Sequence, residues 1–78
     1  MSRYLLVEDV AELLGMSKDT VYRLTARDAI PCRRIRGTRR ILFVPDELDA
    51  WINGAELVVE RAAHGGVVVR PVGTGGAS

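Results

Sequence analysis

The segment from Val7 to Arg27 constrains the fold of this chain most, because it predicts two short helices joined by a tight turn. In its first half, apolar residues recur at the spacing of one helix face: Val7, Val10, Ala11 and Leu14. Gly15 interrupts this pattern, as a residue just past a helix end does. Ser17 is suited to cap a second helix from about Lys18 to Arg27, because its hydroxyl can accept a hydrogen bond from the first turn.

A basic hairpin is predicted directly after these helices. The runs Cys32–Arg36 and Arg39–Val44 have strand character, and Gly37-Thr38 supplies the turn between them. Because side chains alternate across a strand, three apolar residues should face inward and three arginines outward. The apolar residues are Ile35, Ile41 and Phe43, and the arginines are Arg34, Arg36 and Arg40.

Two helices joined through a Gly-containing turn form a helix-turn-helix unit, whose second helix enters the DNA major groove, so DNA binding is predicted.

A third helix is expected to begin at Pro45-Asp46, with Asp46 as its N-cap. One face of this helix should complete the core, together with the lead-in residues Tyr4 and Leu5. The residues on that face are Leu48, Trp51, Ile52 and Ala55. Asn53-Gly54 either ends the helix or only weakens it, because Ala55, Val58 and Ala62 continue the apolar stripe.

The C-terminal part of the sequence changes character at His64, for which no role is predicted. The run from Val67 to Val72 has strand character, and the last six residues are expected to be disordered. The predicted fold class is α+β: a small winged helix-turn-helix of three helices plus a two-stranded wing, with a helical and strand-like tail. The expected divisions are residues 1–53 as the DNA-binding domain, 54–72 as the extension and 73–78 as the tail.

The charge of the chain is sorted along the sequence. Its 78 residues carry a net charge of only +1, and they allow one small domain with a thin core. From Lys18 to Arg40, however, eight basic residues stand against two acidic ones, a net charge of +6. The segments on either side are acidic, at −2 for residues 1–17 and −3 for 41–78. Such sorting steers a protein onto a polyanion in one orientation.

Several classes of function are disfavoured by what the sequence lacks. The single Cys rules out an internal disulfide, and Cys32 is expected to be a small buried residue. The sequence has no membrane-length apolar run and no signal-peptide pattern, which favours a cytoplasmic protein of a bacterial host cell. No phosphate-binding Gly loop, metal-ligand spacing or catalytic constellation is present. We therefore predict a protein that is not an enzyme and uses no cofactor or metal.

Residues 4–52 resemble the excisionase-type winged-helix family, which is related to the DNA-binding heads of MerR-type regulators. The shared elements occur in the same order: an apolar lead-in, VEDVAELLG, SKDTVYR, Pro31, a basic hairpin, and a short helix with the spacing of Leu48 and Trp51. The most similar functional type is the small phage excisionase, or recombination directionality factor. Two departures are Leu6, which replaces the usual Thr cap, and residues 54–78, which have no counterpart in the shared domain.

The DNA-reading face of the second helix follows from its buried side. Val21 and Leu24 should point inward, so the opposite face carries the candidates for base contact: Asp19, Tyr22 and Arg23. Arg23 is the first candidate, since Arg pairs bidentately with guanine, and the resemblance implies the same use. Asp19 could accept from a cytosine amine or hold Arg23, or it could form only a solvated surface pair. Tyr22 would bond a phosphate or lie at the rim of the core.

The remaining candidates flank this face or lie in the wing. Those expected to bind phosphates are Lys18, Thr20, Arg27, Arg34, Arg36 and Arg40. The wing tip, Gly37, Thr38 and Arg39, is the expected minor-groove probe, because an Arg in a narrow minor groove reads DNA shape. The alternative for the wing is a solvated charged hairpin.

The resemblance implies an architectural role: binding cooperatively to attachment-site DNA, bending it, and assisting a tyrosine-type integrase in excision. Self-association through strand addition is predicted for Val67, Val68, Val69 and Val72, unless this strand packs on its own domain or is disordered. The alternatives are a small transcription regulator with the same fold and an adaptor whose basic sector binds an acidic protein.

Overall fold

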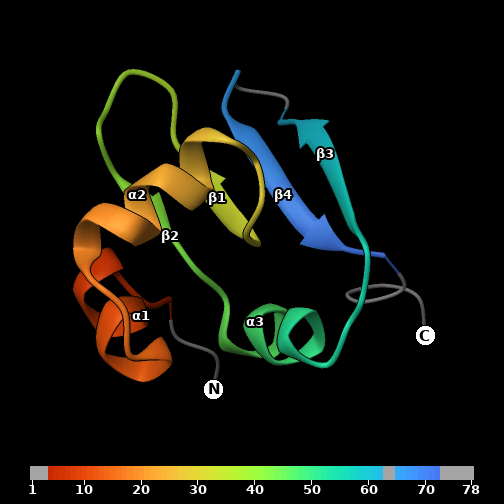
Figure 1. Cartoon of the computed structure of the whole chain (residues 1–78). Helices are drawn as coiled ribbons and strands as arrows, with labels where there is room; N and C mark the ends of the chain where they lie inside the picture. Colours follow the sequence, from red (N-terminus) through yellow and green to blue (C-terminus); the bar gives the residue numbers. More distant parts are fainter. Residues whose placement is uncertain (1–3, 63–64, 73–78) are drawn as a thin grey trace.

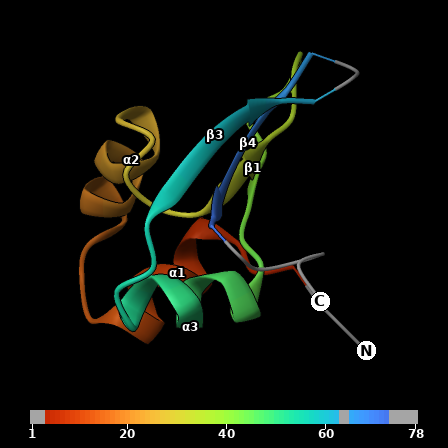
Figure 2. The same ribbon diagram turned by 90° about the vertical axis from the view of Figure 1, so that its right-hand side faces the viewer.

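A computed structural model describes residues 4–62 and 65–72 of the chain as a small α+β fold (Figure 1). Its elements are α1 (Val7–Leu14), α2 (Lys18–Ala26), β1 (Cys32–Arg34), β2 (Ile41–Leu42), α3 (Pro45–Ile52), β3 (Leu57–Arg61) and β4 (Val67–Pro71). Figures 1 and 2 both place α2 and the β1–β2 loop in the upper half of the molecule, with α1 and α3 below them. The predicted α+β class, three helices with a two-stranded wing, is confirmed.

The turn between α1 and α2 has the predicted caps. Gly15 adopts a left-handed conformation with φ of +69°, which costs Gly no steric penalty. Ser17 Oγ accepts a hydrogen bond from the Thr20 amide at 3.1 Å, as an N-cap does. At the start of α1, Leu6 offers no capping oxygen, and Asp9 Oδ2 instead accepts from the Leu6 amide at 2.9 Å. These local contacts fix both ends of α1 and the start of α2.

Four antiparallel strands form one sheet in the order β2-β1-β4-β3. Arg33 lies opposite Leu42 on one side and Val68 on the other, so β1 is an inner strand. β4 is also an inner strand, because Val69 lies opposite Cys32 of β1 and Val59 of β3. The C-terminal extension is therefore part of the same sheet as the wing.

The predicted helical continuation beyond Gly54 is wrong. α3 ends at Ile52, and Gly54, with φ of +101°, turns the chain into β3. The stripe of Ala55, Val58 and Ala62 fits a helical period, but β-branched Val58 and Val59 favour a strand when a partner strand is available. β4 supplies that partner along the whole of β3.

The predicted intermolecular strand addition by the Val-rich segment is also overturned. Val67, Val68 and Val69 are paired with strands of their own chain on both sides, which leaves no backbone edge for a neighbour. Val72, just after β4, donates its amide to the Glu56 carbonyl at 2.7 Å. The alternative, that this strand packs on its own domain, is the one observed. The disorder predicted for residues 73–78 and the assignment of His64 lie outside the described residues.

The core lies between the helices and one face of the sheet. Its buried apolar residues are Val7, Val10, Ala11, Val21, Ile30, Cys32, Phe43, Leu48 and Val69. Leu5, Leu24, Ile41 and Trp51 pack against it half-buried, and Leu5 also pairs with Phe43 through backbone hydrogen bonds of 2.7 and 2.9 Å. Cys32 is buried as predicted.

Three details of the predicted packing are wrong. Tyr4 is 58% exposed and Ile52 is 57% exposed, because the short first segment and the end of α3 turn these side chains away from the core. Val44, rather than Asp46, is the N-cap of α3, with Pro45 in the first turn, where its fixed φ fits. Asp46 instead places a negative charge near the helix N-terminus, where the helix dipole favours it.

Candidate nucleic-acid interface

The exposed face of α2 carries the three residues predicted to contact bases. Val21 is fully buried, which turns Asp19, Tyr22 and Arg23 to the outside. Thr25 is buried beneath them, and its Oγ1 donates to the Tyr22 carbonyl at 2.8 Å. The orientation of this helix therefore leaves its polar side exposed, as insertion of a helix into a DNA major groove requires.

Arg23 and Asp19 form an ion pair across one helical turn. Arg23 Nη2 lies 3.3 Å from Asp19 Oδ2, and the two side chains are 77% and 75% exposed. An exposed pair of this kind contributes only about 0.3–0.5 kcal/mol, so it holds the Arg23 guanidinium only weakly over the exposed face.

The residues predicted to flank this face are also exposed: Lys18, Thr20 and Arg27. Thr20 Oγ1 shares a hydrogen bond of 3.0 Å with Ser17 Oγ at the start of α2. Arg27 is the C-cap residue of the same helix, so Lys18 and Arg27 place cations at its two ends.

The wing is shorter in strand and longer in loop than predicted. β1 and β2 pair only through Arg33 with Leu42 and Arg34 with Ile41, and residues 35–40 form the loop between them. Thr38 closes this loop: its Oγ1 donates to the Ile35 carbonyl at 3.0 Å and accepts from the Arg40 amide at 3.1 Å. Residues 36–40 of this loop are all exposed, and they include the cations Arg36, Arg39 and Arg40.

Arg36 lies against the turn between β3 and β4. A Cβ atom at position 65 would stand 2.6 Å from Arg36 Cδ, so the arginine stem occupies the space that Gly65 leaves. Gly65 also has φ of +95°, which side chains rarely allow. This contact could not be predicted from the spacing of residues, because Arg36 and Gly65 are far apart in the chain.

Arg34 does not point freely outward, as the alternation of the strand predicted. Its side chain is only 31% exposed, and its guanidinium is bound to the C-terminal end of α2. Nη1 donates to the Thr25 carbonyl at 2.5 Å, and Nη2 lies 2.8 Å from Asp28 Oδ1. These contacts direct the side chain toward the end of α2 rather than into solvent.

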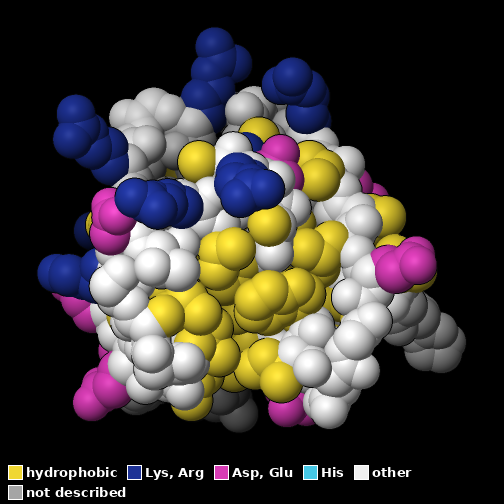
Figure 3. Space-filling view, viewed as in Figure 1, with side chains coloured by type: hydrophobic (Ala, Val, Ile, Leu, Met, Phe, Trp, Pro, Cys, Tyr) yellow, Lys and Arg dark blue, Asp and Glu magenta, His cyan; other side chains and the backbone are white. Residues whose placement is uncertain are grey.

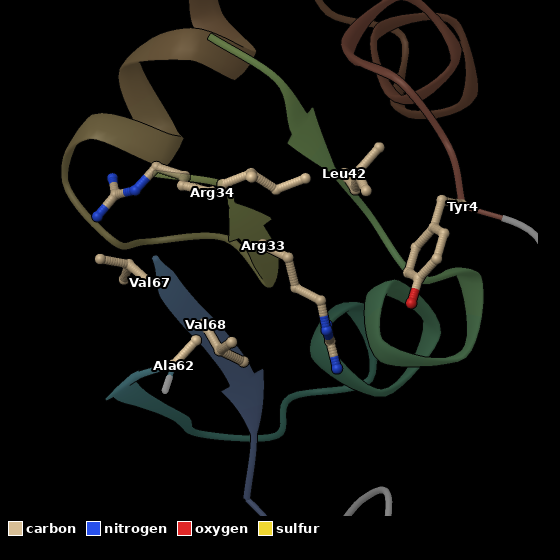
Figure 4. Close-up of a pocket in the computed structure, with 8 residues that line it drawn as sticks. Tyr4, Arg33, Arg34, Leu42, Ala62, Val67 and Val68 are labelled. Carbon is tan, nitrogen blue, oxygen red and sulfur yellow. The ribbon is translucent and has the colours of Figure 1, made fainter. Parts of the chain in front are cut away.

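Arg33 and Glu47 form a second pair that sequence reasoning missed. Arg33 Nη1 and Nη2 donate to the two carboxylate oxygens of Glu47 at 2.6 and 2.7 Å. Glu47 is only 6% exposed, and its carboxylate raises the pKa of the Arg33 guanidinium. The pair ties β1 to α3, and Figure 4 shows Arg33 reaching toward that helix. Charge spacing within one helix could not reveal it, since the partners lie 14 residues apart.

The basic side chains gather in one part of the surface. Figure 3 shows most of the Lys and Arg side chains of this face in its upper half, around α2 and the β1–β2 loop, and an apolar area in its centre. This arrangement agrees with the sorted charge of the sequence, in which residues 18–40 carry a net charge of +6.

A family model described as a helix-turn-helix domain matches residues 4–56, which include all three helices and the wing. The chain belongs to this helix-turn-helix family. The family is a DNA-binding one that includes excisionase-like proteins. Comparison with curated proteins and with solved structures gave no match to this chain. α2 is thus the second helix of the helix-turn-helix unit, the one that enters a major groove in this class of domain.

Three further observations concern pockets, metal ligands and membrane spans. A pocket of about 190 Å³ lies over β1, β2 and β4, lined among others by Tyr4, Leu42 and Val68 (Figure 4). Among the described residues there is no group of His, Cys, Asp and Glu side chains that could hold a metal ion. In the same part of the chain, no helix has the length and apolar character needed to cross a bilayer.

Proposed function

We propose that this helix-turn-helix protein is an excisionase: a sequence-preferring, DNA-bending protein that controls the direction of integrase-mediated recombination. The observation that carries the proposal is the pairing of two exposed cationic elements, the α2 face with Arg23 and the wing loop with Arg39, in one basic sector. Membership of a family that includes excisionase-like proteins supports it further.

Docking on DNA would use the two elements in adjacent grooves. α2 enters the major groove, where Arg23 donates two hydrogen bonds to guanine O6 and N7. The wing loop lies over the neighbouring minor groove, where Arg39 responds to groove width rather than to base identity. Lys18, Arg27 and Arg40 contact phosphates, which orient the domain without reading sequence.

DNA bending is part of the role that the resemblance to excisionases implies, and the small size of the domain makes several copies necessary for it. One such module buries only on the order of 600–1,000 Å², so a single copy binds weakly and discriminates poorly. Several copies on adjacent sites share the cost of bending, roughly 1–6 kcal/mol for a 20–30 bp site. The bent array then favours the excisive complex of a tyrosine-type integrase over the integrative one. This chain performs no chemistry in that scheme.

The proposal is tested by a gel-shift titration on attachment-region DNA, with circularly permuted fragments that report bending. An excisionase gives a ladder of cooperative complexes whose bend grows with each copy bound. A single complex on a palindromic promoter site, with little bend, would instead identify a transcription regulator, because operator symmetry mirrors the symmetry of a dimer. Absence of any complex at low salt would refute DNA binding. The remaining alternative would then be an adaptor whose basic sector binds an acidic protein.

Arg23→Ala sharpens this experiment at the level of one residue. Removing the bidentate donor should cost about 1–3 kcal/mol on the specific site and relax the sequence preference. Arg70→Gln is the matched control, because it also removes one positive charge, but from a residue bound to Glu60. Unchanged specific affinity of Arg23→Ala would show that α2 reads DNA through another face.

A further inference from the structure

Arg34 connects the wing to the helix that reads DNA. It is the last residue of β1, directly before the wing loop, and its guanidinium reaches back to the end of α2. Figure 4 shows its side chain leaving the strand toward the helical turns beside it. The two contacts, with the Thr25 carbonyl and the Asp28 carboxylate, both lie at the C-terminus of α2.

The end of α2 is a place where a cation has a structural effect. The last carbonyls of a helix lack intrahelical partners and carry partial negative charge, which a guanidinium both bonds and neutralises. Asp28 adopts a left-handed conformation with φ of +53°, the only non-Gly residue with positive φ among those described. Its Oδ1 is closed off from solvent, and the Arg34 guanidinium is the charge beside it. Arg34 therefore fixes both the last turn of α2 and the chain reversal that follows.

We infer that Arg34 is a positioning residue for DNA recognition, which fixes the recognition helix relative to the wing through Thr25 and Asp28. The inference rests on the proposed DNA-binding function. It assigns Arg34 a role other than the phosphate contact predicted from the sequence, because both terminal nitrogens of its guanidinium already face acceptors within the protein. Arg39 and Arg40, by contrast, are exposed and remain available for DNA.

The functional consequence follows from the different geometric demands of base and phosphate contacts. A bidentate contact to a base edge needs the guanidinium of Arg23 in one orientation, whereas phosphates accept cations from many directions. If α2 shifts relative to the wing, Arg23 and Arg39 can no longer occupy their grooves together. Loss of the Arg34 contacts therefore lowers discrimination between sequences, while the number of phosphate contacts stays the same.

Asp28→Asn is the variant that separates these roles. It removes the carboxylate charge but keeps every basic residue of the chain, and Asn tolerates the left-handed conformation as well as Asp does. Glu47→Gln is the matched control, because it also removes a carboxylate that is paired with a β1 arginine, but on α3. Removing an acidic charge favours DNA binding in general, so a loss of affinity in Asp28→Asn runs against simple electrostatics.

The experiment measures the dissociation constants for an attachment-site duplex and a random duplex over a range of salt, at a temperature where circular dichroism shows each variant folded. For Asp28→Asn, the ratio of specific to random affinity should fall roughly tenfold, in the range of coupling through positioning networks, with an unchanged salt slope. Glu47→Gln should keep the wild-type ratio. Arg34→Ala should lower the ratio of specific to random affinity as well. The double variant of Arg34→Ala and Asp28→Asn should lower it no further, because the two residues act as one unit.

Three results would overturn the inference. A salt slope lowered by about 0.9 in Arg34→Ala, with unimpaired specificity in Asp28→Asn, would show that Arg34 contacts a phosphate directly. An equal loss of the ratio in Asp28→Asn and Glu47→Gln would attribute the effect to general loosening of the fold. Failure of the wild-type protein to bind any duplex would overturn the proposed function as well, which distinguishes that failure from the first two.

Discussion

Cys32 shows at the scale of one residue how burial sets chemistry in this small domain. It lies on β1 opposite Val69, without exposed surface, and burial raises the pKa of its thiol from 9.0 to about 11. The positive charge of Arg34 opposes this rise but does not cancel it. The thiol is therefore a neutral part of the core at physiological pH, as the sequence predicted.

The raised pKa makes a prediction about stability at alkaline pH. The folded state favours the protonated thiol, so its contribution is complete below about pH 9 and is lost as the pH rises toward 11. The full loss is about 2–3 kcal/mol. Urea unfolding at a series of pH values measures it, and Cys32→Ala should lack this part of the decline. An identical pH profile in Cys32→Ala would assign the decline to other groups.

Residues whose contacts are local were predictable from the sequence, and those with distant partners were not. Ser17 and Gly15 act through neighbours within one turn, so residue type and spacing indicated their roles. Arg33 is paired with Glu47 on α3, and Arg34 contacts Thr25 and Asp28 at the end of α2. Alternation along β1 gives the side of the sheet but not what packs there, which is why Arg34 was predicted to face outward without a partner and the pairing of Arg33 was not predicted.

β4 is the element on which the sheet depends. It lies between β1 and β3 and contributes Val69 to the core. The Val-rich sequence by itself does not indicate which strands it pairs with. The sequence predicted its strand character, because β-branched residues favour strands. The stripe of Ala55, Val58 and Ala62 indicated a helix instead of β3, since a short apolar pattern does not distinguish the two without knowledge of pairing.

A truncated chain ending at Gly66 should therefore fail to fold, rather than only lose cooperativity between copies. It lacks β4, the strand that pairs with both β1 and β3, and so uncovers Cys32, in a domain whose whole stability is of the order of 5–15 kcal/mol. Thermal circular dichroism should show no cooperative transition. A chain ending at Val72 is the control, because it keeps all four strands and the Val72–Glu56 hydrogen bond. A melting curve like that of the control would mean that β4 is dispensable.

The charged side chains of the molecule are unevenly distributed. α2 and the wing loop carry exposed basic residues, while acidic residues lie in the first turns of α1 and α3. The charge count alone, +1, would not single out a DNA-binding protein, but its distribution along the sequence predicted the side on which the cations lie. An uneven charge distribution of this kind can orient a protein toward a polyanion before contact.

Orientation by charge makes a prediction that two variants of equal net charge can test. Arg39 is exposed and makes no ion pair with the described residues, so Arg39→Ala should lower the slope of log affinity against log salt by about 0.9 on every duplex. Arg70 lies on the sheet face away from the core and is bound to Glu60, so Arg70→Gln should leave the slope unchanged. Both variants lose one positive charge, and filter binding at several salt concentrations compares them. Equal loss in both would mean that net charge alone attracts the protein to DNA, without a preferred face.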